Sequence, residues 1–141
     1  MEMLRLEFYV RHTASIAIIA IAICVLAWVA EFADYVYVCP YCRAQRTVIG
    51  ILGLLLLLPA SSHWTVKYIA IVIGFFGAVI GANQHFAGWR KISGGEFKFN
   101  DTILIDPFLL SGAAVTAIIG LTLLIVLKKS NRDTLTTGND A

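Results

Sequence analysis

Charge is scarce in this chain. Asp, Glu, Lys and Arg make up 14% of its 141 residues, whereas a soluble domain contains roughly 25%. The few charges are also segregated, and four stretches contain none of them: residues 14–30, 48–60, 68–83 and 107–127. This pattern excludes an ordinary soluble domain and indicates a membrane protein.

A span through a bilayer requires about 20 mostly apolar residues. The first and last charge-free stretches nearly reach that length, and the third does so from Trp64, because Lys67 can extend its ammonium to the headgroups. The second reaches it only if it begins near Pro40. The sequence therefore predicts an all-α membrane protein, a bundle of four transmembrane helices with short loops. Their predicted ranges are 13–33, 40–60, 64–86 and 105–127.

These spans leave no room for a separate soluble domain, so residues 1–141 are predicted to form one unit ending in a polar, disordered tail over residues 128–141. Four spans place both termini on one side. That side carries six basic residues and the other carries five, which predicts cytoplasmic termini by the positive-inside rule. The connections are expected at residues 31–38, 61–63 and 87–106, and only the last is long.

Cysteine is rare too, since the chain contains three, but two of them form the motif Cys39-Pro-Tyr-Cys42 at the start of the second predicted helix. Thiols two residues apart can close to a disulfide, and a helix start favours the thiolate. The alternatives are an inert disulfide and a zinc site. Zinc needs further ligands, and His85 is the one natural candidate on that side, so we expect no metal. Cys24, within the first helix, is expected to be structural.

Arg46 follows Cys42 by four residues, so both lie on one helix face. An arginine that reaches toward hydrocarbon is costly and marks a functional position. Its charge can stabilise a thiolate at Cys42 and donate hydrogen bonds to a ligand. The alternative is that Arg46 extends to the headgroups beside Arg43.

An outward-facing CxxC between the first two of four short-looped helices, with arginine four residues after the second cysteine, resembles the DsbB family of bacterial inner-membrane disulfide bond formation proteins. The resemblance implies a quinone-dependent thiol oxidase in the inner membrane. Its partner would be a periplasmic DsbA-like thioredoxin-fold protein, and its cofactor ubiquinone or menaquinone. Cys39 would exchange disulfides with the partner, and Cys42 would face the quinone. Arg46 would hold the quinone and favour the thiolate, and His85 would be a further quinone contact.

The chain departs from this family in one respect that affects the mechanism. Family members generally carry a second cysteine pair before the fourth helix, whereas residues 87–106 contain no cysteine. In addition, Val38 replaces a common proline, and Gln45 stands where an acidic residue is frequent. The usual relay of two disulfides therefore cannot operate within this chain.

Three functions remain open at this point. The first is an oxidase that works through the Cys39–Cys42 disulfide alone. The second is a non-catalytic quinone-binding or redox-sensing membrane protein of the same fold. The third is a small transporter, which we rank last because the sequence places no carboxylate inside the predicted spans. We expect contacts with membrane lipid and no nucleic-acid partner.

Overall fold

A computed structural model of the chain describes residues 6–36, 38–99 and 106–128. These residues form helices and no strand, which confirms the predicted all-α class. The elements are α1 (Leu6–Arg11), α2 (Thr13–Phe32), α3 (Pro40–Leu57), the 3-10 helix η2 (Pro59–Ser62), α4 (Trp64–Ser93) and α5 (Pro107–Leu127). The predicted tail lies almost entirely outside the described residues.

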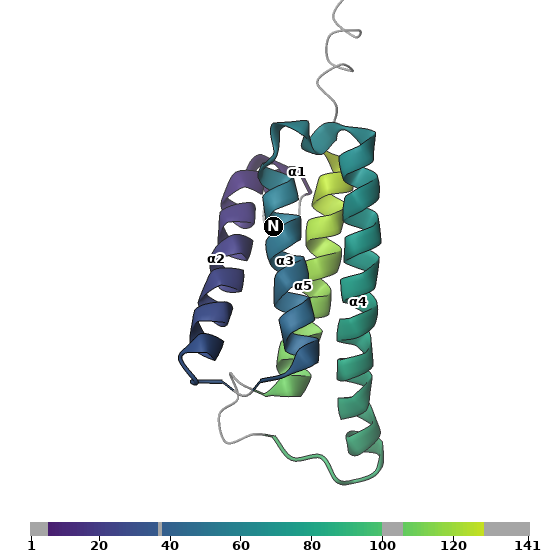
Figure 1. The fold of residues 1–141 in the computed structure, drawn as a ribbon. Helices are drawn as coiled ribbons and strands as arrows, with labels where there is room; N and C mark the ends of the chain where they lie inside the picture. Colours follow the sequence, from purple (N-terminus) through teal and green to yellow (C-terminus); the bar gives the residue numbers. More distant parts are fainter. Residues whose placement is uncertain (1–5, 37, 100–105, 129–141) are drawn as a thin grey trace, which may run out of the picture.

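The four long helices run antiparallel to their neighbours along the chain (Figure 1). Helix α3 is central, because it packs against α2, α4 and α5, and α4 also packs along α5. Helix α2 packs mainly on α3. The start of α2 and the end of α5 lie at the same end of the bundle as η2, whereas the start of α3 lies at the opposite end (Figure 1).

The core of the bundle is formed by aliphatic side chains of α3 and α5, among them Leu52, Leu56, Ile118 and Ile125. Large apolar residues such as Leu26, Phe75 and Leu123 are exposed on the outer faces. Soluble monomers rarely expose so much apolar surface. The helices α2, α4 and α5 are long and apolar enough to cross a membrane. Helix α3 is the exception, because its first turns are polar.

Capping residues in the sequence set several helix boundaries. Helix α5 begins after Asp106, whose carboxylate accepts hydrogen bonds from the N–H groups of Phe108 (2.9 Å) and Leu109 (3.3 Å), with Pro107 as the first helical residue. Helix α3 begins in the same way, with Pro40 in the first turn. It ends at Leu57 and not at the predicted residue 60, because Pro59 holds Leu58 in an extended conformation.

The predicted boundary between the third helix and its following loop was wrong. Helix α4 continues to Ser93 and not to residue 86. The added turns are stabilised by a tertiary contact, in which the Trp89 ring packs edge-on against Phe108 at 5.8 Å. Gly88 allows this approach, since a Cβ there would collide with the Phe108 ring. Arg90 and Lys91 in the last turn also complement the helix dipole.

Glycines let α4 approach its neighbours closely. Gly74, Gly77 and Gly81 are buried on one face of α4, where small residues permit close helix packing. A Cβ at Gly77 would lie 2.6 Å from a methyl group of Val48 on α3. Gly120 on α5 differs, because a Cβ there would meet no atom of the described residues within 4 Å.

We expect Gly77→Ala to destabilise the bundle by roughly 1–3 kcal/mol, because the stiff Val48 side chain cannot move aside without straining α3. Gly120→Ala is the matched control and should leave stability unchanged or slightly raised. Thermal unfolding in detergent measures both. Equal midpoints for the two variants would contradict the close packing of α4 on α3.

Candidate active site

The cysteine pair forms the start of helix α3. Cys39 is the N-cap, and its sulfur accepts a hydrogen bond from the N–H of Cys42 at 3.4 Å. Both cysteines are free thiols and partly buried. The motif thus serves two purposes: Pro40 and the Cys39 sulfur begin the helix, and the unpaired N–H groups of the first turn favour negative charge on sulfur.

Two glutamines that sequence reasoning did not single out complete the surroundings of the thiols. The side-chain amide of Gln84, on α4, donates to the sulfur of Cys42 at 3.6 Å and to that of Cys39 at 3.9 Å. Gln45, buried on α3, donates to the Gln84 side-chain oxygen at 2.6 Å. The sequence contains only a weak indication that these two residues belong to the site: each is an amide side chain within or beside an apolar segment.

Arg46 is buried beside the dithiol, but its charge is directed toward α2. Its guanidinium donates to the carbonyl oxygen of Ala27 at 2.6 Å, forms an ion pair with Glu31 and lies 4.5 Å from the Trp28 ring centroid. Among the described residues, no hydrogen bond or ion pair joins it to Cys42. Its Nε atom is buried and has no hydrogen-bond partner within the described part of the chain.

Glu31 corrects the prediction that the spans lack a carboxylate. The predicted first helix and the predicted connection overlapped at this residue, and the structure places it in the last turn of α2, where it is 4% exposed. Its two oxygens pair with Arg43 and Arg46, both from α3. Burying a carboxylate is costly unless it is paired, and two guanidinium groups from the neighbouring helix make this position possible.

A cavity of about 990 Å³ opens beside the thiols. It runs between α2 and α5, with α3 behind it. Cys39, Cys42, Gln45, Arg46 and Gln84 supply polar groups to it, and most of the remaining lining is aliphatic or alanine. Gly120, where an added Cβ would meet no described atom within 4 Å, also lines this cavity. The shape and composition suit a ligand with a polar head and an apolar tail.

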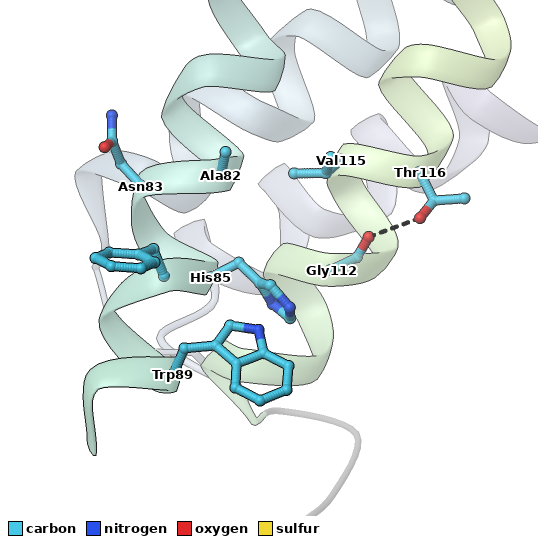
Figure 2. Close-up of a pocket in the computed structure, with 8 residues that line it drawn as sticks. Ala82, Asn83, His85, Trp89, Gly112, Val115 and Thr116 are labelled. Atoms are coloured by element: carbon cyan, nitrogen blue, oxygen red, sulfur yellow. Dashed lines mark hydrogen bonds between the residues drawn. The ribbon is translucent and has the colours of Figure 1, made fainter. Parts of the chain in front are cut away.

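His85 lies elsewhere. It points between α4 and α5 and lines a second cavity of about 720 Å³ together with Trp89, Gly112 and Thr116 (Figure 2). Its Nδ1 atom lies 3.0 Å from the carbonyl oxygen of Phe108, and its ring stacks on the Phe108 ring at 4.3 Å. The structure therefore does not bring His85 into the cavity of the cysteines. Its role as a quinone contact stays a prediction.

Cys24, the third cysteine, is half-buried in α2 and packs against α3. A Cβ at Gly50 would lie 2.5 Å from its sulfur. This close approach of α2 to α3 agrees with the structural role expected for Cys24.

We expect Glu31→Leu to destabilise the protein by about 3 kcal/mol, because it leaves the buried Arg46 without its carboxylate. The double variant Glu31→Leu, Arg46→Leu should lose less, since the one arginine then left without its carboxylate is Arg43, whose side chain is 45% exposed. Glu96→Leu, at an exposed carboxylate, is the control and should have little effect. Thermal unfolding in detergent gives the comparison, and a double variant less stable than the single one would contradict the pairing.

Comparison with known proteins places the chain in a family. The family model described as "Disulfide bond formation protein DsbB" matches residues 11–94. That region includes Glu31, the cysteine pair, Arg46 and Gln84, and it ends just after the last residue of α4. No curated protein and no solved structure is significantly similar to the chain. The family indicates disulfide bond formation at a membrane as the class of function, and the match covers more than half of the sequence. The chain therefore belongs to the DsbB family of disulfide bond formation proteins, as the sequence predicted.

Proposed function

We propose that this protein is a quinone-dependent protein-thiol oxidase. It oxidises a periplasmic DsbA-like thioredoxin-fold protein through the Cys39–Cys42 disulfide and passes the electrons to a membrane quinone, either ubiquinone or menaquinone. The observation that carries the proposal is the placement of a dithiol at the polar end of a large apolar cavity, beside a buried guanidinium. Membership of the DsbB family supports the same reaction.

The two sulfurs occupy different positions, which assigns them different tasks. Cys39 precedes the helix, whereas Cys42 lies within its first turn and against Gln84. A thiolate of the partner attacks the sulfur of Cys39, and a mixed disulfide forms as the Cys39–Cys42 bond breaks. The electron pair of that bond remains on the sulfur of Cys42. A second thiolate of the partner then attacks the mixed disulfide, which releases the oxidised partner and leaves both cysteines reduced.

The cavity fits the quinone that the family implies. Its volume of about 990 Å³ is at the upper end of ordinary ligand sites, roughly 300–1,000 Å³. Arg46 lines the polar end, where its guanidinium can serve as a donor to a carbonyl oxygen, and the alanine and aliphatic lining suits an isoprenoid tail. A quinone bound there supplies the acceptor for the two electrons of the reduced dithiol.

We further propose that α3 is the fourth span, so that the chain crosses the inner membrane four times as a single unit. Its charged residues Arg43 and Arg46 are paired with Glu31 on α2, which lowers the cost of placing them at the membrane. The termini would be cytoplasmic and the cysteine pair periplasmic. Lys67 and Lys128 lie at the end opposite the cysteines, where they donate to the carbonyl oxygens of Val126 and Leu56, and basic residues on that side favour the orientation.

The absence of a second cysteine pair makes the exchange with the partner direct. Cys39 precedes helix α3, and we expect an attacking thiolate to reach its sulfur before that of Cys42. A partner dithiol must therefore approach the start of α3 itself. A dedicated partner, or one that supplies the second pair from another chain, meets this requirement.

The redox state of the dithiol should follow the quinone pool. Free thiols are trapped in intact cells with a mass-tagged maleimide, with quinone present and after its depletion. We expect Cys39 and Cys42 to be oxidised with quinone and reduced without it. Cys24→Ser should preserve this change, whereas Cys39→Ser and Cys42→Ser should each abolish oxidation of a reduced thioredoxin-fold protein by membranes. If Cys39 and Cys42 stay in one redox state with and without quinone, the proposed oxidase function is contradicted. Quinone binding without thiol oxidation would favour a redox sensor.

Filling the cavity should weaken quinone binding without disturbing the bundle. Ala117 on α5 lines the cavity, so Ala117→Phe should raise the Michaelis constant for quinone about tenfold or more, because the ring occupies space required by the tail. Ile119→Phe on the exposed outer face of α5 is the control. Steady-state kinetics with a short-chain quinone measure both, and equal constants would exclude this cavity as the quinone site.

A further inference from the structure

Gln84 is the side chain that links helix α4 to the dithiol of α3. Its amide nitrogen lies 3.6 Å from the sulfur of Cys42 and 3.9 Å from that of Cys39. Its neighbours on α4 face elsewhere, since His85 and Asn83 line the second cavity (Figure 2). Among the described side chains outside the motif, only Gln84 donates a hydrogen bond to either sulfur of the pair.

The direction of this contact is set by Gln45. A glutamine amide carries a donor nitrogen at one corner and an acceptor oxygen at the other, so it can present either to a sulfur atom. Gln45 donates its own N–H to the Gln84 oxygen at 2.6 Å. Gln45 is 4% exposed, which removes water as a competing partner. With its oxygen engaged, the NH₂ group of Gln84 faces the sulfurs.

The charged and titratable groups described around the pair donate no hydrogen bond to the sulfurs, because they are engaged elsewhere. Arg43 and Arg46 are engaged with Glu31 on α2, and Arg46 also with the Ala27 carbonyl oxygen. On the α5 side, the Asp106 carboxylate accepts from backbone N–H groups at its own helix start. His85, the titratable neighbour on α4, is bonded toward α5. The sulfurs thus depend on the helix start and on an amide for the stabilisation of negative charge.

We propose that Gln84 is a catalytic residue of the thiol–disulfide step and that Gln45 is its positioning residue. When the partner thiolate forms its bond to Cys39, the Cys39–Cys42 bond breaks and its electron pair goes to the sulfur of Cys42. The Gln84 N–H stabilises that thiolate, since a hydrogen bond to a charged acceptor is stronger than one to a neutral acceptor. This assignment rests on the proposed oxidase function and adds two residues to it.

The test uses the full chain in detergent with Cys42 as the sole thiol, in a Cys24→Ser, Cys39→Ser background. The rate of iodoacetamide alkylation is followed against pH, which reports the thiolate fraction. In the Gln84→Met variant, we expect the midpoint of this profile to rise by about one pH unit, so that alkylation at neutral pH slows roughly tenfold. Asn83→Met is the matched control on the same helix and should leave the profile unchanged.

A second variant examines orientation while Gln84 stays in place. In Gln45→Met, the N–H that engages the Gln84 oxygen is removed and no charge is added beside the thiols, so the Gln84 amide is no longer held with its NH₂ toward the sulfurs. We expect the same upward movement of the profile. If neither variant moves the midpoint, the proposal is overturned, and if only Gln84→Met moves it, the positioning role of Gln45 is overturned. The measurement requires neither quinone nor partner, so its outcome is independent of whether the dithiol follows the quinone pool.

Discussion

The ion cluster of Glu31 with Arg43 and Arg46 is the interaction on which the rest of the site depends. It joins the end of α2 to the start of α3, with Glu31 and Arg46 buried and Arg43 partly exposed. A single buried carboxylate or guanidinium there would carry a large desolvation cost, which the pairing of Glu31 with the two arginines lowers. The cluster holds the polar first turns of α3 within an otherwise apolar bundle, and it thereby fixes where the two thiols lie.

The cluster also separates two tasks that one arginine was expected to perform. Arg46 was expected to stabilise the Cys42 thiolate and to contact a ligand. In the structure its charge is balanced by Glu31, and its free Nε atom faces no partner in the described chain. The sulfurs instead receive a neutral donor from Gln84. A neutral donor stabilises a thiolate less than a bare cation would, which suits the proposed oxidase, in which Cys42 both leaves a disulfide and gives up its electrons again.

The start of α3 near Pro40 was predicted from the length of a span, and the fit of proline to the first turn of a helix explains it. Helix α5 begins at Pro107, two residues after the predicted residue 105. The dithiol was predictable because a CxxC pair carries its geometry in its own spacing. Tertiary contacts were not predictable in this way. The burial of Glu31 depends on arginines from another helix, and the extension of α4 past residue 86 depends on the contact of Trp89 with Phe108. Neither partner is indicated by the residues next to it in the chain.

Helix α2 packs mainly on α3, and the large cavity occupies the space between α2 and α5. In a bilayer that side of the bundle faces acyl chains and not water. A ligand of the cavity can therefore enter and leave sideways, without passing through either aqueous compartment. In the proposed reaction, the supply of quinone would then be governed by its concentration in the lipid, while a soluble partner would approach the thiols at the end of the same cavity. The packing of α2 mainly on α3 would thus give each of the two proposed reactants its own route to the site.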